Sequence, residues 1–170
     1  MFATNFFLNP KRRQNLSLRS RLRHLLTVLP IRLGLWLGFE HIEYAYVHGD
    51  KSRVRLGRNC STMNTLFNVI SGDIIIGDNT IFGHGCMVLT GTHQFFDGVR
   101  GDLHDPPVPE TPTHGRDIRI GSGCFIGSGA IILGNVTIGD NVIICGGAIV
   151  VKDIPSRSIA AGVPAGVLRS

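Results

Sequence analysis

The chain has 170 residues, of which 43% are hydrophobic, 17% are charged and 22 are glycine. This length favours one compact domain, and so much glycine with so little charge favours short elements joined by tight turns over long surface helices. The four cysteines, at positions 60, 86, 124 and 145, form no C-x-x-C pair, which argues against a zinc knuckle or a redox motif and favours reduced thiols.

Residues 1–46 are predicted to form a capping segment that is basic and partly apolar. Because charged residues interrupt the N-terminus from Lys11 onward, we recognise no secretion signal and expect a cytoplasmic protein. Much of the excess positive charge lies in this segment, at Lys11, Arg12, Arg13, Arg19, Arg21, Arg23 and Arg32.

The stretch 25–39 within this segment is largely apolar. It contains Arg32 and is shorter than the roughly 20 residues that a membrane-spanning helix needs. Two interpretations stay open. The stretch either packs on the fold and covers an exposed end of it, or touches anionic lipid at the inner membrane face with Trp36 and Phe39 as anchors.

Residues 47–170 carry a repeat in which a large apolar residue recurs every six positions. Each hexad fits a short strand whose apolar side chain points inward, followed by a turn such as Gly-Asp-Asn. Stacked coils of this kind pair in parallel and bury one continuous interior, so an all-β solenoid is predicted. The series are Ile120, Ile126, Ile132, Ile138, Ile144 and Val150, and earlier Ile76, Phe82 and Val88, with Leu56 as an outlying member.

The residue four positions after each of these apolar residues is also small or medium-sized. This spacing predicts that Cys60, Cys86 and Cys124 fill the core.

The register breaks between Ile76 and Ile120, which are 44 residues apart, or seven hexads plus two. The break coincides with residues 91–116, a polar and proline-rich stretch that we predict to be an extended loop. Long loops in compact repeats often carry function.

Three motifs occur in order along the repeat: Ile76-Gly-Asp-Asn followed by Leu89-Thr-Gly-Thr-His93, then Val136-Thr-Ile-Gly-Asp-Asn141, then Val151-Lys-Asp-Ile-Pro155 leading to Ala160-Ala-Gly-Val-Pro164. With them the chain resembles the hexapeptide-repeat acyltransferases, in particular the sugar O-acetyltransferase branch with its maltose, galactoside and polysaccharide O-acetyltransferases. The resemblance implies a left-handed parallel β-helix of triangular cross-section. It also implies a homotrimer with active sites in the clefts between neighbouring subunits.

The resemblance further implies an acyl-CoA-dependent O-acyltransferase, with acetyl-CoA as the default donor and no metal. His93 matches the family's catalytic histidine, and a side chain with an unperturbed pKa near 6.5 suits a general base at neutral pH. Ser128 and Gly146 match positions that contact the cofactor, and Lys152 and Arg169 match positions near its phosphates.

The acceptor is expected to be a hydroxyl of a sugar or glycoconjugate, and the candidate acceptor-binding residues are Asn64, His84 and Asp97. Two positions depart from the family pattern. Gly166 replaces a second basic residue, and Met63 aligns with the family's acceptor-binding asparagine, so that Asn64 lies one residue away.

Two alternatives stay open. A non-catalytic β-helix scaffold would not need Thr92-His93 at the point where the loop leaves the repeat, or the Ala-Gly-Val-Pro motif near the C-terminus. A γ-carbonic-anhydrase-like zinc enzyme would need a His-x-x-x-x-His pair, and no two of the seven histidines are five positions apart. No motif for nucleic-acid binding is recognised, so no such partner is expected.

Overall fold

The computed structural model describes residues 45–107 and 111–169. The predicted capping segment, residues 1–46, lies outside these ranges except for its last two residues, so its role as a cap or as a lipid contact stays a prediction. Within the described ranges no helix is long and apolar enough to cross a membrane.

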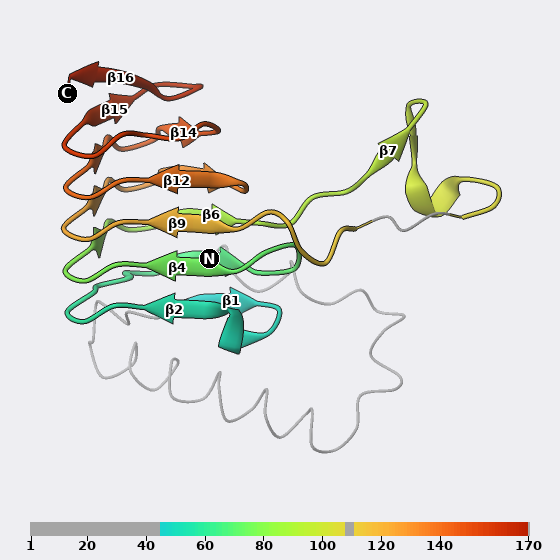
Figure 1. Ribbon diagram of the computed structural model, residues 1–170, viewed down its shortest axis with the longest axis horizontal. Helices are drawn as coiled ribbons and strands as arrows, with labels where there is room; N and C mark the ends of the chain where they lie inside the picture. Colours follow the sequence, from blue (N-terminus) through green and yellow to red (C-terminus); the bar gives the residue numbers. More distant parts are fainter. Residues whose placement is uncertain (1–44, 108–110, 170) are drawn as a thin grey trace, which may run out of the picture. The chain divides into compact units, whose positions relative to one another are not determined.

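Three sheets of stacked short strands form the repeat domain (Figure 1). Sheet A contains β1 (Tyr46–His48), β3 (Leu66–Asn68), β6 (Met87–Leu89), β11 (Ile131–Leu133) and β14 (Ile149–Val150). Sheet B contains β2 (Val54–Leu56), β4 (Ile74–Ile76), β9 (Ile118–Ile120) and β12 (Val136–Ile138). Sheet C contains β5 (Ile81–Phe82), β10 (Phe125–Ile126), β13 (Ile143–Ile144), β15 (Ile159–Ala161) and β16 (Gly166–Arg169).

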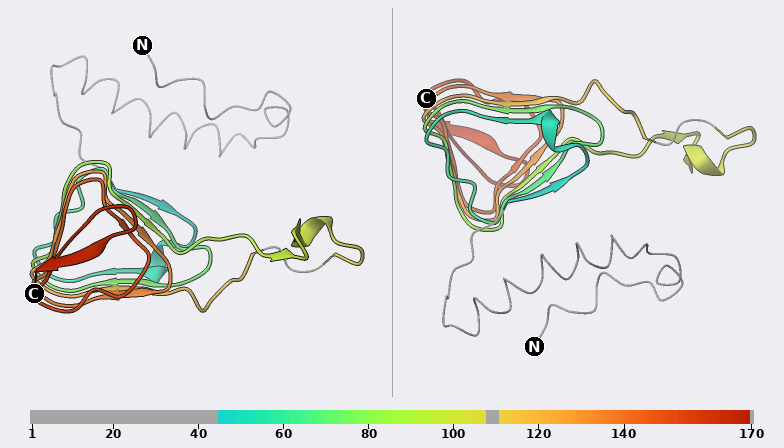
Figure 2. Two further views of the ribbon diagram at one scale, coloured as in Figure 1. Left: turned by 90° about the horizontal axis from the view of Figure 1, so that it is seen from above. Right: turned by 90° about the horizontal axis from the view of Figure 1, so that it is seen from below.

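All strand pairs in the three sheets are parallel except β15 with β16, which closes the C-terminal end as an antiparallel hairpin. The chain visits sheets A, B and C in turn, and viewed along the stack the coils are triangular (Figure 2). This is the architecture of a β-helix of hexapeptide repeats, as predicted. We name the three edges of the prism the A–B, B–C and C–A corners after the sheets they join.

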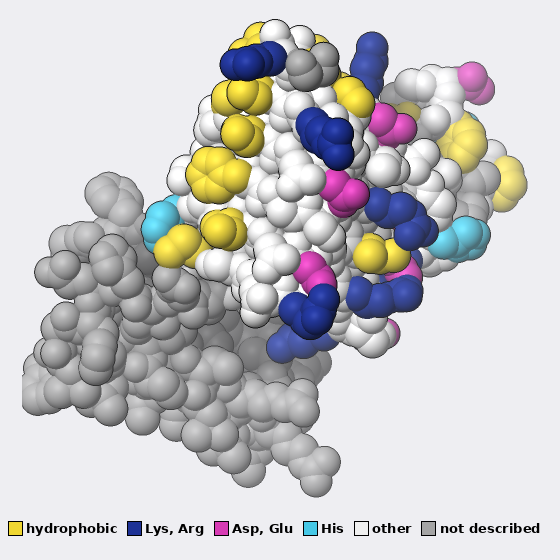
Figure 3. Space-filling view, turned by 60° about the vertical axis from the view of Figure 1, so that its left-hand side comes forward, with side chains coloured by type: hydrophobic (Ala, Val, Ile, Leu, Met, Phe, Trp, Pro, Cys, Tyr) yellow, Lys and Arg dark blue, Asp and Glu magenta, His cyan; other side chains and the backbone are white. Residues whose placement is uncertain are grey.

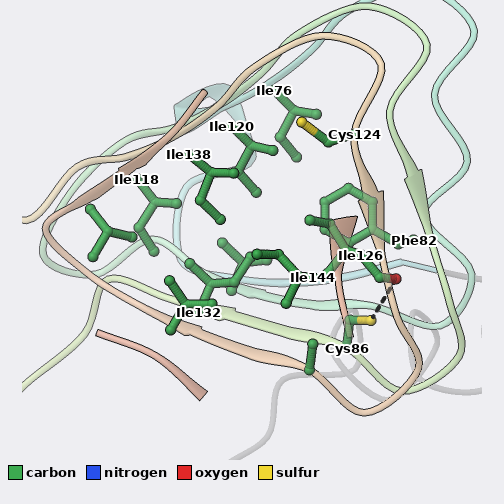
Figure 4. Close-up of a cluster of buried hydrophobic side chains, with 14 of the residues drawn as sticks. Ile76, Phe82, Cys86, Ile118, Ile120, Cys124, Ile126, Ile132, Ile138 and Ile144 are labelled. Atoms are coloured by element: carbon green, nitrogen blue, oxygen red, sulfur yellow. Dashed lines mark hydrogen bonds between the residues drawn. The ribbon is translucent and has the colours of Figure 1, made fainter. Parts of the chain in front are cut away.

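The interior is a stack of the predicted hexad residues (Figure 4). The nine residues of the two series are at most 3% exposed, which confirms their inward orientation. Leu56 is different: it lies on β2, the edge strand of sheet B, and is 48% exposed. Leu56 pairs in register with the buried Ile76, so its side chain has the predicted orientation. It stays exposed because an edge strand has a paired coil on one side only.

The predicted core cysteines lie in or beside this stack. Cys86 and Cys124 are 1% and 2% exposed, and Cys60 is partly buried and packs against the core. Burial is the largest influence on the two fully buried thiols and raises the pKa of each. Both therefore stay protonated at neutral pH and act as core fillers.

The Gly-Asp-Asn turns lie at the B–C corner, where successive coils approach closely. A Cβ on Gly77 would lie 2.6 Å from the backbone nitrogen of Ser122 on the next coil, so only glycine fits there. Asn79 and Asn141 take positive φ angles of 58° and 56°, which asparagine tolerates better than most residues. Asp140, the middle residue of the second Gly-Asp-Asn turn, accepts a hydrogen bond from the Ser122 N–H at 2.7 Å, which links the two coils.

A loop leaves the A–B corner between β6 and β9 and projects away from the prism (Figures 1 and 2). An extended loop was predicted here, and it contains a small antiparallel hairpin that was not predicted, β7 (Phe95–Phe96) and β8 (Val99–Arg100). Asp97 and Gly98 form its turn with φ angles of 48° and 77°, a pair of positive values typical of a tight two-residue turn.

Candidate functional site

The C–A corner brings four of the candidate residues together, and His84, Ser128 and Gly146 stack in one column. Because Leu66 pairs with Met87, Asn64 lies one position beyond this column. Asn64, His84, Ser128 and Gly146 each lie in the turn between a region paired in sheet C and the following strand of sheet A, on successive coils. Ser128 is in contact with both neighbours: its Oγ accepts a hydrogen bond from the His84 N–H at 3.2 Å, and its carbonyl accepts one from the Gly147 N–H at 2.9 Å.

This column is exposed and mostly small. Ser128 and Gly146 lie on the surface, and a Cβ on Gly147 would meet no atom within 4 Å. The same turn position holds positive-φ glycines in the later coils, including Gly129, so little side chain projects from this edge. An extended ligand arm can therefore lie close to the backbone here.

His93 lies elsewhere, beyond the A–B corner at the base of the loop. It follows β6 by four residues, and its side chain is exposed. The next residue is held in place, because the carbonyl of Gln94 accepts a hydrogen bond from the Gly101 N–H at 3.0 Å. His93 is thus presented to solvent from a fixed stem, as a group that exchanges protons with a substrate must be.

The carboxylate of Asp102 interacts with this part of the loop. Its pKa is lowered, chiefly by the hydrogen bond from the Arg100 guanidinium at 2.6 Å and, to a smaller extent, by the positive charge that His93 carries when protonated. Asp102 is therefore ionised at neutral pH.

The structure places the remaining candidates on other edges. Asp97 lies in the turn of the β7–β8 hairpin, on the loop and not at the C–A corner with Asn64 and His84. Lys152 follows β14 at the A–B corner, on the same edge as the loop. Arg169 ends β16 opposite Ile159 in sheet C. Lys152 and Arg169 are both exposed.

Two residues that were not predicted as functional from the sequence, Thr90 and Arg116, hold the base of the loop. Thr90 is fully buried, and its backbone N–H and Oγ1 both donate to the carbonyl of Asn68, each at 2.9 Å. The one signal available from the sequence was position, because these residues flank the break in the hexad register.

No group of three His, Cys, Asp or Glu side chains in the described ranges is arranged to hold a metal ion.

The chain is similar to known transferases of the hexapeptide-repeat type. Residues 117–152 match the family model described as bacterial transferase hexapeptide (six repeats). The galactoside O-acetyltransferase of Escherichia coli K12 is 35% identical over 120 residues, which are 69% of this chain and 54% of the relative. Serine acetyltransferase 2 of Arabidopsis thaliana is 33% identical over 97 residues, 56% of this chain and 26% of the relative.

A solved structure of a galactoside acetyltransferase in complex with coenzyme A superposes with a TM-score of 0.63 and 32% identity, covering 76% of this chain and 60% of the other. The chain spans about half the length, or less, of these two curated relatives.

Proposed function

Since the chain belongs to the hexapeptide-repeat acetyltransferases, we propose that it transfers an acyl group, acetyl by default, from acyl-CoA to a hydroxyl of a sugar or glycoconjugate. The observation that carries this proposal is that the chain presents both an exposed imidazole, at His93, and an exposed column of small residues, at Ser128 and Gly146. Similarity to a galactoside O-acetyltransferase supports the oxygen acceptor.

In the proposed reaction His93 acts as general base. It takes the proton of the acceptor hydroxyl as that oxygen attacks the thioester carbonyl, because a neutral hydroxyl is a weak nucleophile. The tetrahedral intermediate then expels the sulfur of coenzyme A, and His93 returns its proton to that sulfur. The products are the ester and free CoA thiol, and His93 ends in the state in which it began.

We propose that coenzyme A lies along the C–A corner, where Ser128 and Gly146 leave the backbone accessible. Lys152 and Arg169 would then contact its phosphates through charge-assisted hydrogen bonds. In one chain, however, Lys152 lies at the A–B corner, whereas Ser128 and Gly146 lie at the C–A corner. Sheet A likewise separates His93 from the column at the C–A corner.

This separation supports a homotrimer in which the site forms between subunits. The C–A corner of one copy would supply Asn64, His84 and Ser128, and the loop of its neighbour would supply His93 and Asp97.

The outer face of sheet C provides apolar surface for such assembly. Phe125 pairs with Ile81 on one side and Ile143 on the other, and the three are 47%, 48% and 42% exposed. Figure 3 shows hydrophobic side chains one above another on this side of the molecule. A continuous apolar ladder on a parallel sheet is the kind of surface that a protein–protein contact buries.

For the segment outside the described residues, we propose that its basic residues bring a cytoplasmic enzyme to the inner membrane face without altering the reaction. Replacing Arg12, Arg13, Arg19 and Arg21 with Glu should abolish sedimentation with anionic vesicles and leave the rate on a soluble acceptor unchanged. A wild-type chain that does not bind such vesicles would contradict this role.

The proposed activity is tested by incubating the chain with several acyl-CoA species and sugar acceptors and following release of free thiol. Acceptor-dependent release from acetyl-CoA is expected. A β-helix scaffold would release no thiol with any donor.

A further inference from the structure

One side chain joins the points where the loop leaves the repeat and where it returns. Arg116 precedes β9, where the chain re-enters the coils, and Thr90 follows β6, where the chain departs. The guanidinium of Arg116 donates from Nε to the carbonyl oxygen of Thr90 at 2.9 Å and from Nη2 to the carbonyl oxygen of Gly134 at 2.7 Å. Gly134 lies at the same corner on the next coil, between β11 and β12.

The backbone around Arg116 extends this connection to the coil on the other side. Its N–H donates to the carbonyl of Ser71 at 3.1 Å, and the Ser71 N–H donates to the Oγ1 of Thr90 at 3.1 Å. Thr90 and Ser71 are fully buried. The base of the loop is therefore a closed network across three coils, with the guanidinium as its charged member.

Arginine suits this position for a geometric reason. Its planar fork directs two N–H groups at two carbonyls at once, whereas lysine presents a single ammonium on a flexible stem. The backbones also approach closely here, since a Cβ on Gly134 would lie 2.6 Å from the Arg116 carbonyl oxygen. The geometry fixes the carbonyl of Thr90 within the loop base.

We propose that Arg116 is a positioning residue for acyl transfer. By holding Thr90, three residues before His93, it sets the position of the His93 imidazole at the point where the loop leaves the repeat. This inference rests on the proposed function of His93. The hydrogen bond between Gln94 and Gly101 holds the chain on the other side of His93. Releasing the Thr90 side alone would let the imidazole move relative to the acceptor hydroxyl, and displacements of about 1 Å can cost on the order of 100-fold in rate.

Two substitutions test the hydrogen-bond donors and the positive charge of Arg116 separately. Arg116→Met keeps an apolar stem but removes every donor, and Arg116→Lys keeps the charge but loses the fork. We expect kcat for acyl transfer to fall on the order of 100-fold in Arg116→Met and less in Arg116→Lys. The KM for acetyl-CoA should stay at the wild-type value in both. The matched control is Arg119→Met, at an exposed position in β9 on the same sheet, which should change neither constant.

A double-mutant cycle distinguishes positioning from stability. If Arg116 acts through His93, Arg116→Met should leave the residual rate of a His93→Ala enzyme unchanged, because no base remains to be positioned. An equal fold loss in both backgrounds, or an unchanged kcat in the single variant, would overturn the proposal. Should Arg116→Met fail to assemble, Arg116→Lys carries the same cycle. A His93→Ala enzyme as active as the wild type would instead contradict the proposed function.

Discussion

The backbone N–H of His84 donates a hydrogen bond to the side-chain oxygen of Ser128, 3.2 Å away on the next coil. The two residues occupy equivalent turns at the C–A corner, and the contact holds the Ser128 hydroxyl at the exposed edge. Because the Ser128 oxygen accepts this bond with a lone pair, its hydroxyl hydrogen can still be donated to a ligand.

Replacing Ser128 with Ala should therefore weaken binding of acyl-CoA. Loss of one neutral hydrogen bond of about 1 kcal/mol corresponds to about a fivefold rise in KM, with kcat little changed. Ser122→Ala is the matched control, because Ser122 occupies the equivalent place over Gly77 at the B–C corner that Ser128 occupies over Gly83. Steady-state kinetics with varied acetyl-CoA measure both variants. Equal KM values for the two would remove Ser128 from the donor site.

Lys152 should contribute to donor binding through charge. Lys152→Ala is expected to raise the KM for acyl-CoA by roughly one to two decades, the value of a hydrogen bond to a charged group, and to change kcat less, because phosphate contacts persist through the reaction. Lys51→Ala is the control, since Lys51 is also exposed and lies between β1 and β2 at the A–B corner of the first coil. If Lys152→Ala has the same KM for acyl-CoA as the wild type, the proposed phosphate contact of Lys152 is wrong.

Assembly should depend on the apolar ladder of sheet C. We expect light scattering to give the mass of a trimer for the wild type and a smaller mass for Phe125→Glu, because a buried charge without a partner opposes association. Arg119→Glu, on the outer face of sheet B, should remain trimeric. A wild-type chain that is monomeric at concentrations where it is fully active would contradict the intersubunit site.

Arg157 is expected to limit the stability of the last coil. It takes a φ of 62° at the B–C corner, where the equivalent positions of other coils hold Asn79, Gly123 and Asn141. Left-handed backbone costs an ordinary L-residue roughly 1 kcal/mol, and asparagine lowers that cost. Arg157→Asn should therefore raise the melting temperature of the assembled protein by a few degrees in a thermal scan. An unchanged or lower melting temperature would show that the arginine side chain itself stabilises this turn.

The hexad period was sufficient to predict the core, because a six-residue spacing places one apolar residue inward on each side of a triangular coil. It also explains the column, since Ser128 and Gly146 are 18 residues apart and therefore stack at one corner. Lys152 is six residues beyond Gly146 and so falls at the next corner, a consequence the motif comparison did not reveal.

The loop was less predictable. The 44-residue gap hides the coil register, so the spacing could not show that His84 and Ser128 stack or that His93 lies on another edge. The hairpin around Asp97 was missed although Asp-Gly is a known turn pair, because the flanking strands are two residues each and show no alternation. The contacts of Arg116 are to backbone carbonyls, which carry no sequence signature.

The role of His93 is tested most directly by the rate at which His93→Ala releases thiol from acetyl-CoA in the presence of a sugar acceptor. Loss of a general base predicts a fall in kcat of roughly 100-fold to 10,000-fold with the assembly state unchanged. His114→Ala, at another exposed histidine of the same loop, should retain the wild-type rate. A His93→Ala enzyme that assembles normally and keeps the wild-type kcat would contradict the role of His93 as the catalytic base.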